Sequence, residues 1–583
     1  MEFNVFSVFT LLGGLAFFLY GMNVMSNGLE KLAGSRLESA LKRMTSNVWS
    51  SLALGAGITI AIQSSSALTV MLVGLVNSGI MEISQTVGVI MGSNIGTTLT
   101  AWILSLSGID SGNFFINLLK PENFSPLIAL LGILLIMMSK KDFRKSVGSI
   151  CLGFAILMYG MELMKVSMEP LAESEQFASI LTAFNNPVLG VLVGALFTGV
   201  IQSSAASVGI LQALSLTGGI TYGMAIPIIM GQNIGTCVTA VISSIGVSKN
   251  AKKVSVIHLV FNIIGTVLCL VLFYGAHAIF HFALVDQDAQ PWSIALIHTI
   301  FNVFVTIVLL PFSKLLVKLA NAVIRGEEKV QKHRFLDERL LSTPSVAASE
   351  CNNLTVKMAQ LSQQTLLSAM DMIGHYVGKE ADAIRESEDF LDRYEDELGT
   401  YLVKLSGKEL SDADSRRVSK LLHTIGDFER LGDHALNLLD GAREMHDKQI
   451  TFSEDAQREL GVLTAAIRDI MQRTVAAFVN DDIKAAREIE PLEQIIDLLS
   501  TDIKARHIER LRAGECTIEL GFILSDMLNN YERISDHCSN IAVTIIELGH
   551  DSFQTHEYLN AVKSDDEEFR ELFKAYQKQY QLA

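Results

Sequence analysis

The chain has 583 residues, of which 49% are hydrophobic and 19% are charged, and its formal net charge at pH 7 is −16. This length exceeds the usual size of one domain. The acidic balance argues against a nucleic-acid partner, because phosphate backbones are bound by clustered Lys and Arg. The sequence holds no GxxxxGK[ST] motif and no GxGxxG after a strand, so we expect no nucleotide-dependent chemistry and no enzyme.

The charged residues divide the chain into two parts. Residues 1–320 hold 13 acidic and 15 basic side chains, whereas residues 321–583 hold 49 and 31. A nearly neutral, hydrophobic and glycine-rich part is typical of a membrane domain. We therefore predict an all-α protein with a polytopic membrane domain followed by a soluble acidic domain. The predicted domains are a membrane domain at 1–320, a linker at 321–345, a cytosolic helical domain at 346–550 and a C-terminal helical tail at 551–583.

The first apolar segment lacks the basic start and the short core of a cleavable signal peptide, so we expect it to be a retained helix. The six cysteines show no CxxC pair or other zinc spacing, which favours reduced cytosolic thiols. Membrane segments are predicted at residues 5–28, 84–106, 124–139, 146–168, 222–246, 254–284 and 292–311.

Two further apolar stretches, residues 48–80 and 187–220, each contain a glutamine followed by serines. The first motif is Gln63-Ser64-Ser65-Ser66, and Gln202-Ser203-Ser204-Ala205 repeats it at an offset of 139 positions. Neutral hydroxyls and amides are costly to bury in apolar sequence unless they bind something. Packing of small residues between helices is the alternative, but duplication at a constant offset favours a binding role.

The duplication extends well beyond this motif. Phe17–Met22 matches Ile156–Met161, and Gly92–Thr97 matches Gly231–Thr236, both at the same offset as the Gln–Ser motifs. Internal duplication is typical of secondary transporters, whose binding site lies at the interface between the repeats. We predict repeats at about 5–139 and 146–284, with an additional helix at 292–311.

Basic clusters predict the topology, because cytoplasmic loops are enriched in Lys and Arg. If each Gln–Ser stretch enters and leaves the membrane on one side, every basic cluster falls inside and both acidic loops fall outside. Each repeat then makes three crossings, so the second is inverted. We predict two re-entrant hairpins, seven crossings of the plasma (inner) membrane, an external N-terminus and a cytoplasmic C-terminal domain. The basic clusters are Lys31/Arg36/Lys42/Arg43, Lys140/Lys141/Arg144/Lys145, Lys249/Lys252/Lys253 and Lys314/Lys318/Arg325, and the acidic loops carry Glu169/Glu173/Glu175 and Asp286/Asp288.

Re-entrant turns would place helix N-termini near the midplane, where their N–H groups favour anions. Serine and glutamine oxygens also ligate hard cations such as sodium. An anion site without Lys or Arg suits co-transport, since the coupling cation supplies the positive charge. For Asn94 and Asn233, capping of a broken helix and direct ligation both stay open. We expect the membrane histidines His258 and His298 to pack between helices or lie at the membrane interface. The predicted site residues are Gln63, Ser64, Ser65, Ser66, Asn94, Thr97, Thr98, Gln202, Ser203, Ser204, Asn233 and Thr236.

The paired Gln–Ser motifs, together with Gly92-x-Asn-Ile-Gly-Thr-Thr and Gly231-x-Asn-Ile-Gly-Thr, resemble the sodium-dependent phosphate (type II Na/Pi) cotransporter family over roughly residues 5–310. The resemblance implies sodium-coupled transport of inorganic phosphate by inverted repeats, with both motifs at the site. Ala205 departs from the pattern where the first motif has Ser66, which leaves the number of bound sodium ions open.

The soluble part also repeats. Asp427–His434 matches Asn530–His537 at an offset of 103 positions, and an acid pair upstream recurs at an offset of 101. Acids four residues apart share a helix face. Facing pairs would hold a divalent or ferric metal; the alternative is a solvated face with Arg430 and Arg533 as salt-bridge partners. Helices are expected at 346–376, 380–405, 411–446, 453–480, 482–512, 516–548 and near 555–580. The candidate metal ligands are Asp392, Asp396, Glu429, Asp433, Glu493, Asp497, Glu532 and Asp536; His434 and His537 lie about 100° round the helix and are not among them.

The Glu-Arg-Ile/Leu-x-Asp-His stretches resemble the PhoU family of phosphate-regulatory proteins over roughly residues 346–550. This resemblance implies a six-helix domain of two three-helix bundles, a divalent or iron/zinc-type metal, and a regulatory protein partner or self-association. The expected partners are inorganic phosphate and membrane lipid. Three other functions stay open: a sodium-independent phosphate exporter or channel, a phosphate-sensing signalling protein, and transport of another anion such as arsenate or sulfate.

Overall fold

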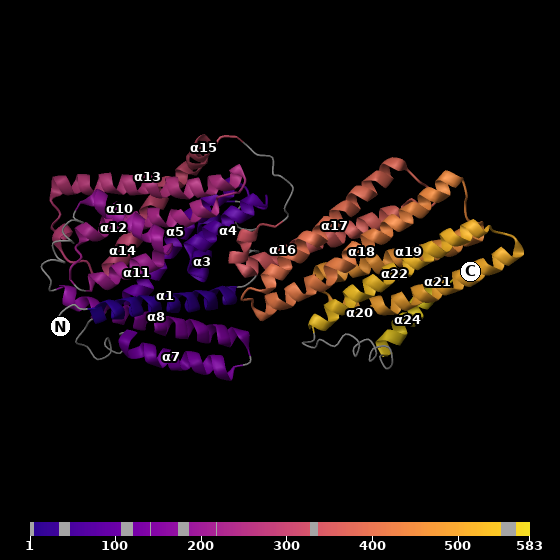
Figure 1. Cartoon of the computed structure of the whole chain (residues 1–583), viewed down its shortest axis with the longest axis horizontal. Helices are drawn as coiled ribbons and strands as arrows, with labels where there is room; N and C mark the ends of the chain where they lie inside the picture. The colour runs from indigo at the N-terminus through magenta and orange to yellow at the C-terminus, as the bar shows by residue number, and fades with distance from the viewer. Residues whose placement is uncertain are drawn as a thin grey trace. The chain divides into compact units, whose positions relative to one another are not determined.

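The computed structural model describes residues 5–33, 47–106, 121–139, 141–172, 186–216, 218–326, 336–549 and 567–582. Every regular element in these ranges is a helix, and one isolated antiparallel bridge joins Thr221 to Asp288. The predicted all-α class is confirmed. The chain divides into two compact units, Met1–Val346 and Ala347–Ala583 (Figure 1).

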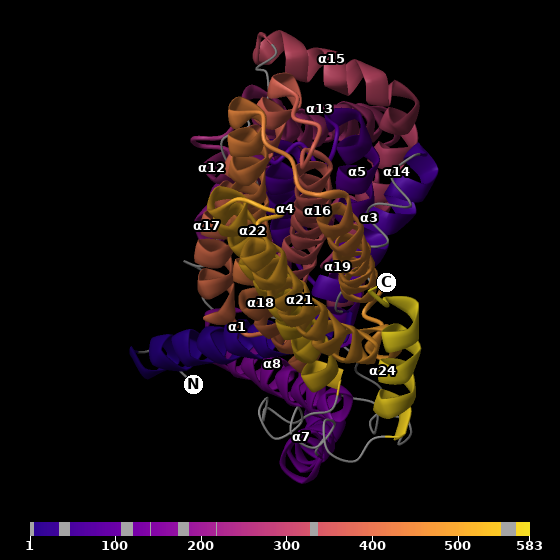
Figure 2. The same ribbon diagram turned by 90° about the vertical axis from the view of Figure 1, so that its right-hand side faces the viewer.

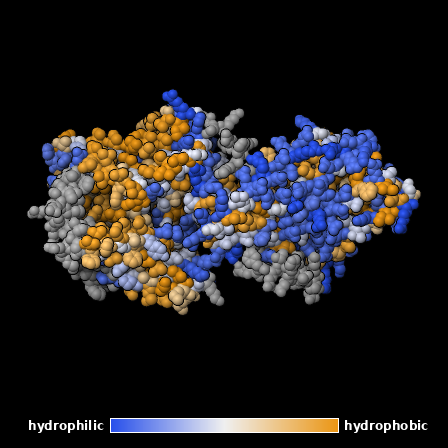
Figure 3. Space-filling model, viewed as in Figure 1, coloured by the Kyte–Doolittle hydropathy of each residue, from blue (hydrophilic) through white to orange (hydrophobic). Residues whose placement is uncertain are grey.

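The first unit is built of apolar helices, and among its described residues six helices are long and apolar enough to cross a membrane. The seventh predicted crossing is α7, whose apolar stretch Asn123–Met138 is shorter. On the face seen in Figure 3, apolar residues cover much of this unit, whereas the second unit is mostly hydrophilic. Its elements are α1 (Val5–Ala33), α3 (Val48–Ile62), α4 (Ser65–Asn77), α5 (Ile83–Ser105), α7 (Pro121–Met138), α8 (Asp142–Ala172), α10 (Pro187–Ile201), α11 (Ser204–Ser215), α12 (Tyr222–Ser243), α13 (Lys249–Phe280), η3 (Ala283–Asp286), α14 (Pro291–Leu309), η4 (Leu310–Phe312), α15 (Ser313–Val323) and η5 (Glu338–Ser342).

Helices α1 and α8 show that the second repeat is inverted. A Cβ at Gly14 would lie 2.9 Å from the carbonyl oxygen of Gly160, and one at Gly21 would lie 2.6 Å from that of Gly153. The earlier glycine of one helix therefore meets the later glycine of the other, so the two helices are antiparallel, as they lie in Figure 1. Since Gly14 matches Gly153 and Gly21 matches Gly160, equivalent helices run in opposite directions. The predicted inverted repeat is confirmed.

Contacts within each repeat are duplicated as well. A Cβ at Gly55 would lie 2.1 Å from the carbonyl oxygen of Val89, and one at Gly194 would lie 2.2 Å from that of Ile228. Both residues of the second contact stand 139 positions after those of the first. Gly55 and Gly194 leave no room for a larger side chain, because the backbone of α3 packs directly on that of α5 and the backbone of α10 packs directly on that of α12.

The second unit is a helical bundle whose helices run side by side (Figures 1 and 2). An edge-to-face pair of Phe428 and Phe478, with ring centroids 4.9 Å apart, lies in its core. The helix predicted at 482–512 is divided at Glu488. The elements are α16 (Pro344–Asp371), α17 (Gly378–Ser406), α18 (Asp412–Lys448), α19 (Glu454–Asn480), α20 (Ile483–Arg487), α21 (Ile489–Ala513), α22 (Ile518–Gly549) and α24 (Glu567–Gln579).

Part of the predicted linker is folded onto the first unit. Helix α15 continues to Val323, and residues 336–342, which include η5, pack against α4. Several residues used in the predictions lie outside the described residues: Arg36, Lys42, Arg43, Lys140, Glu173, Glu175, residues 327–335 of the linker and residues 551–566 of the tail.

Candidate functional site

Both Gln–Ser motifs form a break between two helices. Gln63 ends α3 in the left-handed conformation, with φ 52° and ψ 24°, and Ser64 follows in extended conformation. The Ser64 hydroxyl oxygen accepts a hydrogen bond from the Ala67 N–H at 3.1 Å, so Ser64 is the N-cap of α4. The 48–80 stretch is therefore two short helices, as the re-entrant hairpin requires.

The second break has the same backbone. Gln202 ends α10 with φ 57° and ψ 22°, and the Ser203 hydroxyl oxygen accepts from the Ala206 N–H at 3.2 Å. A left-handed residue at a helix end is usually glycine, because other residues pay about 1 kcal/mol or more there. Glutamine stands at both positions, so the two repeats share this departure from glycine.

The glutamine side chains of the two breaks differ. The Gln63 amide nitrogen donates to the Ile60 carbonyl at 2.7 Å, and its oxygen accepts from the Thr100 hydroxyl at 2.8 Å. Gln202 is exposed. The hydroxyl of Thr239, which matches Thr100, is buried and has no hydrogen-bond partner among the described residues. The glutamine and threonine side chains are thus hydrogen-bonded to each other in the first repeat and not in the second, among the described residues.

Hydroxyl and amide side chains near the two breaks also have different hydrogen-bond partners in the two repeats. The Thr59 hydroxyl donates to the Ser93 hydroxyl at 2.8 Å, and that of Thr198 donates to Ser207 at 2.7 Å. Gln232 stands where the first repeat has Ser93, and its amide donates to the Ser207 carbonyl at 3.1 Å. The sequence predictions did not include these five residues, although Thr59 and Thr198 are 139 positions apart and Ser93 lies inside the Gly92–Thr97 motif.

Asn94 and Asn233 lie in the middle of continuous helices, so the helix-capping interpretation is wrong for both. The Asn94 amide donates to the side-chain oxygen Oδ1 of Asn262 in α13 at 3.1 Å, and the Asn233 amide donates to the backbone carbonyl of Ile229 at 2.9 Å. The hydroxyls of Thr97, Thr98 and Thr236 donate to backbone carbonyls of their own helices, those of Ser93, Ile95 and Gln232. Ser65 and Ser204 are buried in the first turns of α4 and α11, and Ser66 is half-buried.

Each helix that starts at a break packs against the opposite repeat. Helix α4 contacts α12 and α13, and α11 contacts α5. The buried Gln212 of α11 donates to the carbonyls of Ala101 and Pro291, both at 2.9 Å. The breaks are therefore tied to the interface between the repeats, where a secondary transporter binds its substrate. His258 and His298 are both fully buried between helices, in agreement with a packing role.

In the second unit, two of the predicted metal ligands, Asp392 and Asp433, lie close together with a third carboxylate, that of Glu388. One ligand oxygen each of Glu388, Asp392 and Asp433 lies within 4.8 Å of the others. Burial and the charges of Asp392 and Asp433 raise the pKa of Glu388, and burial with the Asp433 charge does the same for Asp392. Burial and Asp433 raise the pKa of the neighbouring Glu429 to about 7. Repulsive, partly dehydrated carboxylates fit a hard cation, which would relieve the repulsion.

The predicted ligands did not include Glu388. The residue that matches it in the other half, at the offset of 101, is the apolar Ile489, so the internal repeat gave no signal there. Gly432 lets α18 approach α17 beside this cluster, since a Cβ there would lie 2.7 Å from Leu391. Arg430 lies 3.7 Å from Glu429 and 3.9 Å from Asp433, so the salt-bridge interpretation also has support.

The remaining predicted ligands are not grouped in this way among the described residues. Asp396 is exposed on α17, close enough to raise the pKa of Asp392. Glu493 and Asp497 lie on α21, and Glu532 and Asp536 lie on α22. Arg533 pairs with Asp536 at 3.6 Å.

Two protein-family profiles match this chain, one in each of its two units. The Na+/Pi-cotransporter family profile matches residues 17–166 and again 156–285, and the PhoU domain profile matches residues 355–441 and 463–545. The chain joins a Na+/Pi-cotransporter domain to a PhoU domain. Both families are of transporter and regulatory type rather than enzymes, and the apolar helices belong to a multi-pass membrane protein.

Relatives resemble the whole chain or parts of it. YjbB of Salmonella typhimurium, a protein named for inorganic phosphate export, is 22% identical over 94% of this chain and 99% of its own length. Sodium-dependent phosphate transport protein 2A of Rattus norvegicus is 36% identical over 16% of this chain and 15% of its own. The crystal structure of PhoU from Pseudomonas aeruginosa is 19% identical over 35% of this chain and 98% of its own, with a TM-score of 0.34.

Proposed function

We propose that the protein carries inorganic phosphate across the membrane, coupled to sodium, through a site formed by the two Gln–Ser breaks. One observation carries this proposal: two helix breaks at matching positions of the repeats have the same backbone, and both place glutamine where glycine is usual. A structural kink alone does not need an amide side chain at such a position. Membership of a phosphate-transport family supplies the substrate class.

Charge arguments support a coupling cation. No charged side chain lies within residues 45–80 or 177–247, which include both breaks. The N-termini of α4 and α11 attract an anion with partial charges only. Sodium bound by serine and glutamine oxygens would neutralise phosphate in this apolar environment, where an uncompensated charge is costly.

The predicted topology has support from contacts between distant segments. Asn77, Ser248 and Asp337 are all predicted on the cytoplasmic side, and they are joined by hydrogen bonds. On the predicted outer side, the N–H of Tyr222 donates to the Gln287 carbonyl at 2.9 Å. These contacts group the segments by side, and the basic clusters assign the sides, so we propose an external N-terminus and a cytoplasmic PhoU unit.

Radiolabelled phosphate flux into proteoliposomes tests the site. Gln63→Ala and Gln202→Ala should each abolish flux in protein that purifies as wild type does. Gln287→Ala is the matched control, because that side chain is exposed and the hydrogen bonds of Gln287 to Tyr222 and Leu284 are made by its backbone. Full flux in both site variants would refute the two-break site.

Sodium-independent export is the second candidate, favoured by the name of the relative YjbB. It uses the same two breaks but needs no coupling ion, so phosphate would only equilibrate. The two candidates therefore differ in sodium dependence and not in the residues of the site.

We also propose that the PhoU unit binds a divalent or ferric metal at the Glu388/Asp392/Asp433 cluster and regulates flux. Purified protein with Asp392→Asn and Asp433→Asn should hold less metal by elemental analysis, and Glu532→Gln is the control in the other half. Truncation after Val346 should preserve flux and remove its regulation. Unchanged metal content in the double variant would exclude this cluster as the ligand set.

A further inference from the structure

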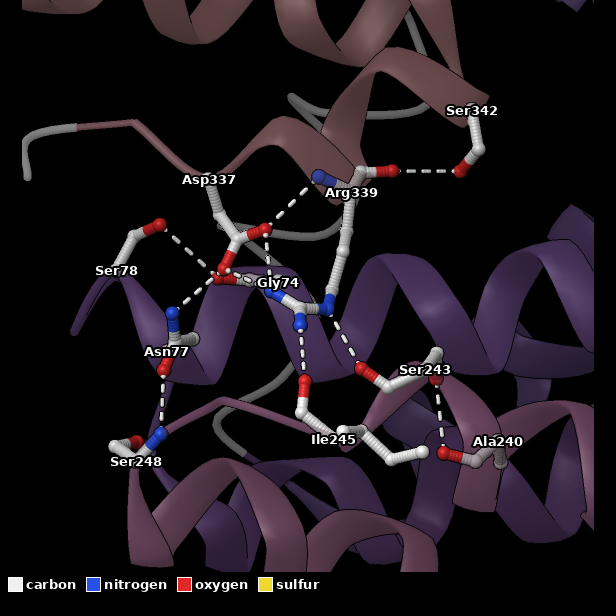
Figure 4. Close-up of polar contacts among 10 residues, drawn as sticks. All are labelled: Gly74, Asn77, Ser78, Ala240, Ser243, Ile245, Ser248, Asp337, Arg339 and Ser342. Atoms are coloured by element: carbon white, nitrogen blue, oxygen red, sulfur yellow. Dashed lines mark hydrogen bonds and ion pairs between the residues drawn. The ribbon is translucent and has the colours of Figure 1, made fainter.

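The segment Leu336–Ser342 binds the first unit at the end where α4 finishes (Figure 4). Leu340 is fully buried, and a Cβ at Gly74 of α4 would lie 3.1 Å from its methyl carbon Cδ2. The Asp337 carboxylate is also buried, and it accepts a hydrogen bond from the Asn77 amide at 2.6 Å. A buried leucine and a buried carboxylate show that this segment is docked rather than loosely tethered.

Arg339 of the same segment binds the second repeat. Its guanidinium donates to the carbonyls of Ser243 and Ile245 at 2.6 and 2.8 Å, at the C-terminal end of α12. An arginine here satisfies carbonyls that the helix leaves without partners and complements the negative end of the helix dipole. A second pair of hydrogen bonds, to Asp337 at 3.1 and 3.2 Å, fixes the guanidinium.

Asn77 completes the connection between the repeats. While its nitrogen donates to Asp337, its oxygen accepts from the Ser248 N–H at 2.9 Å, at the start of α13. The end of α4 in the first repeat is thus joined both to Leu336–Ser342 and to the α12–α13 connection of the second. The position that matches Asn77 in the second repeat is Leu216, which cannot make these bonds.

We propose that Leu336–Ser342 is a latch that holds the cytoplasmic end of the transport path closed and must release once in each cycle. Helix α4 has 13 residues and begins at the first Gln–Ser break. A helix of this length is about 20 Å long, and in the proposed release it moves as one unit. Displacement at Asn77 is therefore carried to Ser64. The latch lies directly before α16, so the chain of the PhoU unit is continuous with it.

The test uses full-length protein in proteoliposomes and rests on the proposed phosphate transport for its flux readout. In the Asn77→Cys/Asp337→Cys variant, a short bifunctional methanethiosulfonate should stop flux, and reductant should restore it. Asp337→Ala and Arg339→Ala should instead raise the initial rate several-fold. Gln287→Ala, an exposed position outside the segment, should have no effect. Undiminished flux after cross-linking, or lower flux in the weakened variants, would overturn the latch.

A second readout separates failure of the latch from failure of the proposed function. Ser78→Cys places a thiol beside the docked segment, where the native hydroxyl contacts the Gly74 carbonyl (Figure 4). Asp337→Ala should speed its reaction with a water-soluble maleimide several-fold, and Gln287→Ala should not. Equal labelling rates in the three backgrounds would overturn the latch even if no variant transports phosphate.

Discussion

His434 and His537 form a reciprocal pair across the two halves of the PhoU unit. Their ring centroids are 5.5 Å apart, His434 Nδ1 lies 2.8 Å from Asn530 Oδ1, and His537 Nδ1 lies 2.8 Å from Asp427 Oδ1. Asp427 and Asn530 are matching positions of the internal repeat, as are the two histidines. Each histidine therefore binds the helix that carries the other, and α18 and α22 are joined by two equivalent contacts.

His537 is paired with the carboxyl group of Asp427, whereas His434 is paired with the neutral amide of Asn530. Replacing this amide with a carboxyl group should therefore change the pKa of His434. Burial lowers the pKa of His434, although its hydrogen bond to Asn530 acts in the opposite direction. Asn530→Asp should raise the pKa of His434 by about one unit or more, because a carboxylate at hydrogen-bond distance favours imidazolium. Proton NMR titration of labelled histidine measures this change. Asn529→Asp adds the same charge at an exposed neighbouring position, and an equal change there would contradict the local explanation.

The acidic cluster predicts a pH-dependent stability in chelator-treated protein. Burial and Asp433 raise the pKa of Glu429 from 4.5 to about 7, so the folded state favours the protonated acid. This contribution to stability is present below pH 4.5 and is lost as the pH rises towards 7. Amide hydrogen exchange, corrected for intrinsic rates, should show α17 and α18 losing protection over that interval. Glu429→Gln should flatten the profile, and Glu532→Gln should leave it unchanged. A divalent metal should restore protection at pH 7.

Backbone contact between α3 and α5 predicts a position-specific effect of adding one methyl group. Gly55→Ala would place its Cβ 2.1 Å from the Val89 carbonyl oxygen, whereas a Cβ at Gly57 of the same helix would meet nothing within 4 Å. Gly55→Ala should lower the free energy of unfolding by about 1–3 kcal/mol through overpacking. Thermal unfolding in detergent compares the two variants. Equal stability would show that α3 does not pack on α5 in this way.

The hydrogen bond between Thr100 and Gln63 predicts unequal effects in the two repeats. Thr100→Val removes a bond worth about 1 kcal/mol, which corresponds to roughly five-fold weaker phosphate binding. Thr239→Val removes a hydroxyl that has no partner among the described residues and should have a smaller effect. The phosphate concentration at half-maximal flux measures both. Identical losses would show that the two halves are equivalent in function.

The helices and the two breaks could be predicted from sequence because local signals determine them. Apolar runs, the uncharged Gln–Ser stretches and the constant offset between the repeats need no knowledge of distant contacts. Glu388 could not be predicted, since it meets Asp433 only after α17 and α18 pack. The roles of Asn77 and Arg339 likewise depend on contacts with residues 94 to 260 positions away in the sequence. Nothing in the sequence of the linker indicates which helices it contacts.

Phosphate accumulation in proteoliposomes with an inward sodium gradient is the most direct test of coupled transport through the two breaks. The account predicts accumulation above the external concentration with sodium, none with potassium in its place, and none with either cation in Gln63→Ala or Gln202→Ala. Equilibration at the same rate with either cation would contradict sodium coupling and favour the exporter.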